Sequence, residues 1–323
     1  MNQFGNKFRL SIWGESHGPQ IGILLDGVPA GIPLAISDFE EDLARRRSGG
    51  LGTTPRREAD MPQLLSGIYQ GHTTGAPLAI AFENNNTRSQ DYPDPAHCRP
   101  SHADRTAMVR FAGYNDPRGG GHFSGRLTAG LVAAGVVAKK ILPATVSFTT
   151  RLTEIGGCTD PDRFDDILRE ATSSHDSVGG IVECRIKGIP AGWGDPFFDS
   201  VESLVAHLLF AVPGVKGVEF GAGFNAARHR GSENNDRIID AQGTTATNHA
   251  GGIDGGITNG NELIVRVAFK PTASIAQPQE TFNFSSGRIE PLTIRGRHDA
   301  CIALRGAVVV EAVVAIALAD LRC

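Results

Sequence analysis

This chain of 323 residues has few cysteines, few lysines and few aromatic side chains. Its five cysteines are scattered and form no Cys-x-x-Cys pair, which argues against a disulfide framework and a zinc site. We therefore expect reduced thiols, no metal and a cytoplasmic location, because free thiols are typical of a reducing compartment. The start MNQFGNKFRLSIW lacks a charged residue followed by a long apolar run, so no signal peptide is expected.

Signatures of nucleotide, nucleic-acid and membrane binding are also missing. The chain has no Gly-x-x-x-x-Gly-Lys-[Ser/Thr] loop, and no Gly-x-Gly-x-x-Gly lies between a clear strand and a helix. A formal net charge of −4 argues against a nucleic-acid partner, which usually needs a basic face. The apolar segment 302–321 contains Arg305 and Glu311, which predicts a core helix and no membrane partner.

The basic side chains that are present are mostly arginines. Only six of the 31 basic residues are lysine, and the rest are arginine. The planar guanidinium binds phosphate or carboxylate through two parallel hydrogen bonds, whereas an ammonium acts as a point charge. This bias predicts a small anionic ligand.

Hydrophobic patterns predict an α+β fold in a single domain that spans residues 1–323. Segments 128–142 and 302–321 are apolar on nearly every face, so both helices must be covered on all sides by sheets or by partner subunits. Ser37 and Glu40 predict a capping box, and Asp199 or Ser200 predicts the start of another helix. Strands are predicted at 8–13, 21–25, 67–69, 78–82, 145–152, 181–189, 218–220 and 262–269.

Three consecutive glycines, Gly119 to Gly121, mark the segment around which we expect the site to form. Without side chains the backbone can approach a ligand closely, and a following helix would offer free N–H groups to an anion. A tight turn before a core helix is the alternative. Cationic side chains gather nearby and favour an anion site: Arg99, His102, Arg105, Arg118 and Arg126.

Two histidines are set among glycine, arginine and acidic residues, and are candidates for proton transfer near neutral pH. His17 lies in Gly-Glu-Ser-His-Gly and His102 in Arg-Pro-Ser-His-Ala-Asp. The alternative is that each only stabilises a turn. The first motif also matches Gly-x-Ser-x-Gly, the nucleophile elbow of serine hydrolases with Ser16 as nucleophile, although Pro19 and a strand-like segment follow where that motif needs a helix.

A third cluster, Arg-Gly-Arg-His-Asp at 295–299, precedes the last helix. It could bind an anion and hold a base, or Asp299 could simply cap the helix. A protein that binds anions without catalysis is therefore a further alternative to an enzyme.

Together these residues resemble the chorismate synthase family from Phe4 to Asp320. The matching segments, in order, are FGNKFRLSIWGESHG, DLARRR, TTPRREAD, SGIYQGHTTGAPLAI, NNNTRSQDY, RPSHADRT, RGGGHFSGRLTAG, VKGVEFGAGF, RGSENND, TNHAGGIDGGITNG, KPTASI and RGRHDAC.

The resemblance implies a lyase of the shikimate pathway, which leads to the aromatic amino acids. Enolpyruvylshikimate phosphate would lose phosphate and a ring hydrogen by trans elimination to give chorismate. Reduced FMN would be needed although no net electrons are consumed, with NADPH or a separate flavin reductase as the source of electrons. The implied fold has helices between two antiparallel sheets, and the implied assembly is a homotetramer.

The resemblance also implies roles for single residues. His17 would protonate or hydrogen-bond the reduced flavin, His102 would assist the departing phosphate, and Asp299, with Ser16, would take the proton from flavin N5. Arginines expected to meet the substrate or a nicotinamide donor are Arg45, Arg46, Arg47 and Arg126. Residues expected to hold the flavin are His122, Phe123, Ser124, Pro213, Gly214, Gly255, Lys270, Pro271, Thr272, Ala273, Ser274 and Arg297.

Some positions differ from the commonest family pattern. Leu51 and Gly52 stand where a further arginine is frequent, so one anion or nicotinamide contact is expected to be missing. His122 and Phe123 replace arginine and serine, so flavin contacts there are expected through the backbone.

Overall fold

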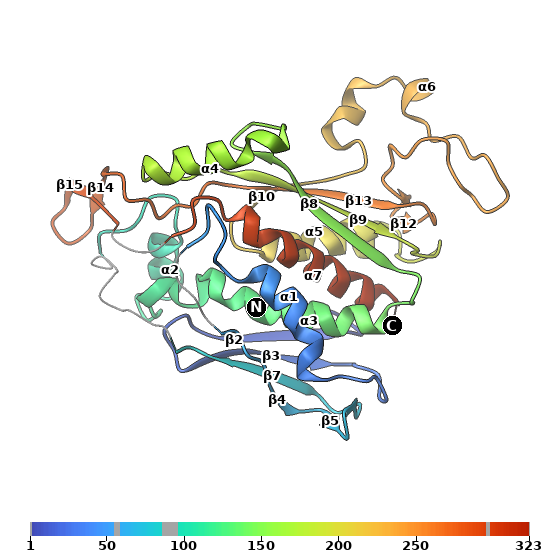
Figure 1. Cartoon of the computed structure of the whole chain (residues 1–323), viewed down its shortest axis with the longest axis horizontal. Helices are drawn as coiled ribbons and strands as arrows, with labels where there is room; N and C mark the ends of the chain where they lie inside the picture. Colours follow the sequence, from blue (N-terminus) through green and yellow to red (C-terminus); the bar gives the residue numbers. More distant parts are fainter. Residues whose placement is uncertain (1, 55–58, 86–95, 295–297, 323) are drawn as a thin grey trace.

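The protein has two antiparallel sheets with a layer of helices between them (Figure 1). The computed structural model describes residues 2–54, 59–85, 96–294 and 298–322. The first sheet has the order β1-β2-β3-β7-β4, formed by Gln3–Phe4, Arg9–Gly14, Gln20–Asp26, Leu78–Glu83 and Gln63–Ser66. The second has the order β10-β13-β9-β8, formed by Val215–Phe220, Leu263–Phe269, Gly180–Lys187 and Ser147–Ile155. This confirms the predicted α+β sandwich.

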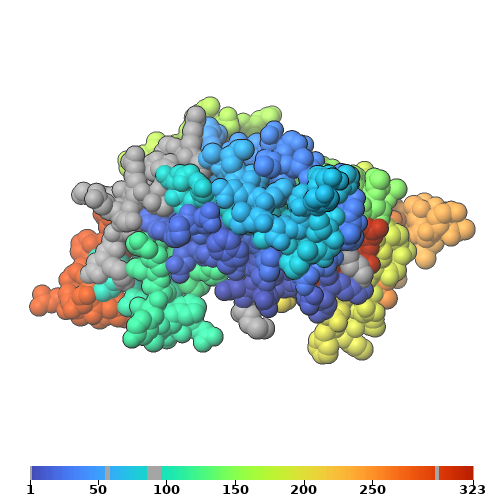
Figure 2. Space-filling view, turned by 90° about the horizontal axis from the view of Figure 1, so that it is seen from below, coloured from blue at the N-terminus to red at the C-terminus, as the bar shows by residue number. Residues whose placement is uncertain are grey.

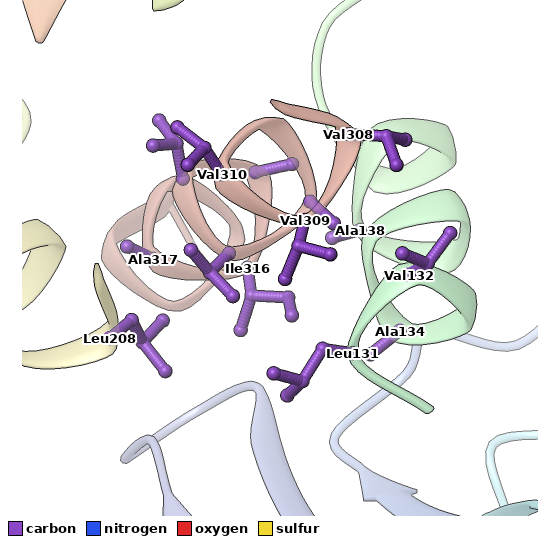
Figure 3. Close-up of a cluster of buried hydrophobic side chains, with 14 of the residues drawn as sticks. Leu131, Val132, Ala134, Ala138, Leu208, Val308, Val309, Val310, Ile316 and Ala317 are labelled. Carbon is purple, nitrogen blue, oxygen red and sulfur yellow. The ribbon is translucent and has the colours of Figure 1, made fainter. Parts of the chain in front are cut away.

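The middle layer consists of α1 (Glu40–Arg46), α3 (Thr128–Ile141), α5 (Val201–Ala211) and α7 (Ala303–Arg322). Helices α3 and α7 pack closely because small residues face each other, and a Cβ on Gly135 would lie 2.4 Å from that of Ala312. Figure 3 shows their valine, leucine and alanine side chains meeting, with Leu208 of α5 beside them. Both helices that were predicted to be covered on all sides are buried in this layer.

Smaller elements lie around the sandwich. Helix α4 (Phe164–Ser173) packs at the outside, and α2 (Asp104–Arg110) follows the predicted long loop. The hairpin of β14 (Gln279–Asn283) and β15 (Arg288–Leu292) and the segment around α6 (Gly231–Asn234) project at opposite ends of the molecule (Figure 2). Short strand pairs are formed by β5 (Ile68–Tyr69) with β6 (His72–Thr73) and by β11 (Ile253–Asp254) with β12 (Ile257–Thr258).

The N-terminal caps of two helices, α1 and α5, were predicted from the sequence, and one of the two predictions is confirmed. Ser200 caps α5, since its Oγ accepts the Ser203 N–H at 3.1 Å, as one of the two alternatives predicted. The capping box of Ser37 and Glu40 is wrong. A 3₁₀ turn, Ile36–Phe39, precedes α1, and the Ala35 N–H donates to the Asp38 carboxylate at 2.7 Å. The tighter first turn moves the cap two residues earlier and makes Asp38 its acidic partner.

No helix within the described ranges is long and apolar enough to cross a membrane. The four cysteines that the structure describes, Cys98, Cys158, Cys184 and Cys301, are free thiols.

Candidate active site

A cavity of about 730 Å³ opens at one end of the helical layer, where loops from both halves of the chain meet. Its walls come from several parts of the chain. The N-terminal half contributes residues of β1 and β2, the end of α1, the turn 101–103 before α2, and residues between 119 and 131 that lead into α3. The C-terminal half contributes 207–216 from the end of α5 to the start of β10, 269–274 from the end of β13, and residues between 298 and 309 at the start of α7. A pocket of this size is typical of small-molecule and cofactor sites.

The three glycines lie against two distant histidines, and of these two only His102 is among the described residues that line the cavity. All three have positive φ (61°, 81° and 53°), which breaks the helical geometry inside the segment Arg118–Phe123, and a 3₁₀ turn, Gly125–Leu127, follows before α3 begins. A Cβ on Gly119 would lie 2.6 Å from Nε2 of His17, and one on Gly120 would lie 3.5 Å from Nε2 of His102. The helix predicted after the glycines is confirmed, since α3 begins at Thr128, and the positive φ values keep the glycine loop itself out of that helix. The missing side chains of the glycines make room for the imidazoles.

The turn with Ser16 and His17 is fixed to this glycine loop. The Ser16 N–H donates to the Gly121 carbonyl at 3.0 Å, and His122 Nδ1 lies 2.7 Å from the Gly14 carbonyl oxygen. Ser16 is buried, and β3 follows its turn where a nucleophile elbow needs a helix. The local structure therefore gives no support to the hydrolase alternative.

His102 belongs to a partly buried hydrogen-bonded group with Asp104 and the buried Arg99. Its Nδ1 lies 2.7 Å from Oδ1 of Asp104, while Arg99 donates to Oδ2 through Nε at 2.8 Å and to Oδ1 through Nη2 at 2.7 Å. Burial opposes ionisation of Asp104, but hydrogen bonds from Arg99 and His102 outweigh it and hold the pKa of this carboxyl well below its usual range. Asp104 is thus an ionised carboxylate whose Oδ1 accepts a hydrogen bond from Nδ1 of His102.

The three consecutive arginines at the end of α1 point in different directions. Arg46 and Arg47 line the cavity. Arg45 lies outside it and forms ion pairs with Glu311 at 2.7 Å and with Asp42 at 2.8 Å. Residues one position apart on a helix do not share a face, so only part of the triplet can meet one ligand.

Arg46 and Arg126 share one buried carboxylate, that of Asp60. Arg46 donates to Asp60 at 2.8 Å and to Thr128 Oγ1 at 3.0 Å, and Arg126 forms an ion pair with the other carboxylate oxygen. Burial raises the pKa of Asp60, but the charges of Arg46 and Arg126 lower it by more. The pKa of this carboxyl is therefore below its ordinary value. All three line the cavity, and they carry more positive than negative charge.

Asp299 also lines the cavity and is held from two sides. It accepts the Thr54 N–H at 2.8 Å and forms an ion pair with Arg305 of α7 at 3.0 Å. The preceding residues 295–297 lie outside the described residues, and with them the predicted flavin ligand Arg297.

The predicted flavin segments are largely gathered on the cavity wall. Lining residues from these segments are His122, Phe123, Ser124, Pro213, Gly214, Lys270, Pro271, Thr272, Ala273 and Ser274. Gly255 lies in the turn between β11 and β12, outside the cavity of this chain. Lys270 donates to the Ser101 carbonyl at 2.6 Å, and burial, followed by the charge of Lys216, lowers the pKa of its ammonium group.

Sequence reasoning missed several residues of the site. Asp60 follows an arginine-rich stretch, and Arg305 is a charge in an apolar helix; both were visible signals of a buried ion pair. Asn84 accepts from Arg126 at 2.9 Å and donates to the carbonyls of Glu15 and Gly18, so it links the arginines to the His17 turn. Nothing in its local sequence indicated that link.

Comparisons with known proteins agree with one another. A sequence model of the chorismate synthase family matches residues 8–323. The chorismate synthase of Chitinophaga pinensis is 57% identical, over 99% of this chain and 96% of that protein. The chorismate synthase of Dehalococcoides mccartyi is 42% identical, with the same coverage of both chains. Among solved structures, a crystal structure of chorismate synthase aligns with a TM-score of 0.76 and 25% identity, over 98% of this chain and 92% of that one.

Proposed function

The chain belongs to the chorismate synthase family, a family of lyases, and from this premise we propose that it converts 5-enolpyruvylshikimate 3-phosphate into chorismate. In this trans elimination the C–O bond to phosphate breaks, the phosphate leaves with the bonding electrons, a ring hydrogen is removed, and a new C=C bond forms. The observation that carries the proposal is the cavity in which His102, the Arg46–Arg126 pair and Asp299 converge.

The phosphate end of the substrate needs cations and a proton donor. Arg46, Arg47 and Arg126 line the cavity, and Asp60 neutralises only part of their charge. Stabilising the charge that develops on a leaving group in a water-poor site is commonly a large part of catalysis. We assign the anion contacts to these arginines and hydrogen bonding to the departing phosphate to His102.

The cavity residues fit a flavin mononucleotide. Lys216 and Lys270 are two neighbouring cations on the wall, suited to a phosphate, and Thr272 Oγ1 is buried without a hydrogen-bond partner among the described residues. We propose that segments 122–124, 213–214 and 270–274 hold reduced FMN. When bound, reduced FMN would supply the electron-rich ring needed for loss of phosphate without net electron consumption.

Residues near the glycine loop and at the start of α7 would handle protons. We propose that His17 would protonate or hydrogen-bond the bound flavin, and that the carboxylate of Asp299, with Ser16, would accept the proton that flavin N5 would lose. The ion pair with Arg305 and the hydrogen bond from the Thr54 N–H support this role for Asp299, because they hold its carboxylate in place at the cavity wall. His17 and Ser16 lie against Gly119, so small movements of the glycine loop would reach both.

The proposal extends to assembly and setting. We propose a single catalytic domain over 1–323 that forms a homotetramer, and the exposed Phe197, Phe198 and Phe224 support contact between copies. Free cysteines and the biosynthetic family support a cytoplasmic location. Electrons for FMN would come from NADPH or from a separate reductase. Light scattering tests the tetramer, and an NADPH oxidation assay tests the source of electrons.

The deciding experiment measures two products at once. Purified protein receives enolpyruvylshikimate phosphate under anaerobic conditions with FMN reduced by dithionite, and phosphate and chorismate are followed together. We expect equal amounts of both with reduced FMN, and neither with oxidised FMN or without flavin. Phosphate release without chorismate, or no product from folded protein with bound flavin, would contradict the proposal.

A further inference from the structure

The turn that presents His102 contains a built-in orienting device. Arg99 is almost completely buried, with 5% of its side chain exposed, and it directs Nε and Nη2 at Asp104. Its backbone N–H also donates to Asp104 Oδ2 at 3.0 Å. A bidentate guanidinium fixes the plane of a carboxylate as well as its charge. Oδ1 is thereby held 2.7 Å from Nδ1 of His102.

These contacts determine which ring nitrogen bears the proton. A carboxylate oxygen only accepts, so at 2.7 Å the Nδ1 atom must be protonated to avoid two facing lone pairs. Arg99 Nη2 lies 3.0 Å from Nδ1 because both donors meet at the same oxygen, Oδ1. The remaining nitrogen, Nε2, lies beside Gly120 at the cavity wall, where glycine leaves room for it.

From this geometry we infer that Asp104 and Arg99 are positioning residues, which hold His102 as the Nδ1–H tautomer and leave Nε2 as the nitrogen that exchanges protons in the cavity. The inference rests on the proposed function for the role of His102 in turnover, but the tautomer itself does not depend on it. In the proposed reaction, protonated His102 gives its Nε2 proton to a phosphate oxygen as the C–O bond breaks.

The same arginine connects the histidine to the segment proposed for FMN. Arg99 Nη1 donates to Ser274 Oγ at 3.2 Å, and Lys270 Nζ donates to the Ser101 carbonyl at 2.6 Å. Two hydrogen bonds therefore join the His102 turn to residues 270–274. Displacing Arg99 should disturb the orientation of His102 and the placement of this segment together.

The first test reads the tautomer directly. Solid-state ¹⁵N NMR of the full-length protein labelled at histidine, at a pH where the ring is neutral, identifies the His102 signals by their loss in His102→Gln. We expect a protonated Nδ1 and an unprotonated Nε2 in the wild type. Asp104→Asn should mix or reverse the two forms, because the amide NH₂ of asparagine can donate to an unprotonated Nδ1. A wild-type ring protonated at Nε2 alone would overturn the inference, whether or not any variant folds.

The second test uses turnover of the enzyme loaded with reduced FMN. Asp104→Asn should lower kcat by about 10²- to 10⁴-fold with KM within about threefold, as expected when a general acid is left in the wrong tautomer. Arg99→Lys keeps the charge but loses the fork, and should lower kcat by about tenfold or more. Asp26→Asn is the matched control, an arginine-paired aspartate at the exposed end of β3 that should keep wild-type turnover.

The two proposals fail in different ways. Wild-type kcat and an unchanged His102 tautomer in Asp104→Asn would overturn the positioning role while leaving the lyase intact. Absence of turnover in the wild type would contradict the proposed function, and the NMR result would still decide the tautomer.

Discussion

Two clusters of charged side chains begin at neighbouring residues, Arg45 and Arg46, and differ in their balance. Arg45 joins Asp42, Lys139 and Glu311 in a group with two positive and two negative charges, packed between α1, α3 and α7. Arg46 joins Arg126 and Asp60 in a group with two positive charges and one negative, on the cavity wall. The balanced group is complete without a ligand, whereas the other retains positive charge for an anion.

The cavity wall and the helical layer also differ in backbone strain. Asp60 and Ser101 are non-glycine residues with positive φ, 47° and 58°, and both line the cavity. Residues in α1, α3 and α7 have no such conformation in the described chain. Four other described non-glycine residues with positive φ, Gln70, Ala112, His175 and Phe197, lie outside the cavity, so such strain is not confined to its wall. At Asp60 and Ser101 the surroundings hold it where a ligand would bind. The comparison therefore separates a part of the helical layer that provides stability from a wall that is arranged for binding.

The largest expected effect comes from removing one of the two positive charges in the cluster of Arg46, Arg126 and Asp60. Arg46→Met should lower kcat/KM by about 10²- to 10³-fold, because it removes a charged hydrogen-bonding partner of the substrate worth about 3 to 4 kcal/mol. Steady-state phosphate release at several substrate concentrations measures the loss, with circular dichroism to show that the variant is folded. Unchanged kcat/KM would mean that the cavity arginines do not meet the substrate.

Gly119→Ala should have the next largest effect. Its Cβ would lie 2.6 Å from Nε2 of His17 and 2.8 Å from Ser16 Oγ, so one or both side chains must move. We expect kcat to fall by about 10²-fold, since small displacements of catalytic groups are costly. Gly113→Ala is the matched control, because Gly113 also has positive φ, 82°, but no atom lies within 4 Å of its added Cβ. Equal losses in both variants would attribute the effect to backbone strain.

Glu311→Gln breaks the balanced cluster and should affect stability, leaving kcat per folded molecule unchanged. Burial opposes ionisation of Glu311, but Arg45 and Lys139 outweigh it and lower its pKa to about 2 from an ordinary 4.5. A depressed carboxyl pKa stabilises the fold above pH ~4.5, and this contribution is lost as the pH falls towards ~2. We expect the variant to lose about 3 kcal/mol at pH 7.

Urea unfolding at pH 7 and pH 3 measures this contribution. The wild type should lose stability between the two pH values by more than Glu311→Gln does, because only the wild type takes up a proton at this site. Parallel pH dependence of the two proteins would show that Glu311 does not stabilise the fold through its charge.

The sequence was sufficient to predict the helical layer, the central strands and the region of the chain around which the candidate site lies. Apolar residues on every face predicted α3 and α7, and alternation predicted the central strands, because these patterns follow directly from burial. Glycine, histidine and arginine near 119 predicted where a site would form. These signals are local, and each depends on residues close together in the chain.

Partners that lie far apart in the chain could not be predicted in the same way. His17 and His102 lie against the neighbouring glycines Gly119 and Gly120 only because of the tertiary fold, and Asp60 reaches both Arg46 and Arg126 in the same way. Three consecutive arginines on a helix must point in different directions, but the sequence does not show which of them faces the cavity. The wrong capping box has a smaller cause, a 3₁₀ turn that lies within the usual uncertainty of helix ends.

The smallest expected effect comes from relieving the backbone strain at Ser101 on the cavity wall. Ser101→Gly should stabilise the protein by about 0.5 to 1 kcal/mol, because glycine adopts φ of 58° without the steric cost that serine bears. Ser101→Ala keeps a Cβ and should bring no such gain, which makes it the matched control. Urea unfolding of both variants at pH 7 gives the difference. If both had wild-type stability, the turn that presents His102 would store no measurable strain, and the contrast with the helical layer would rest on charge alone.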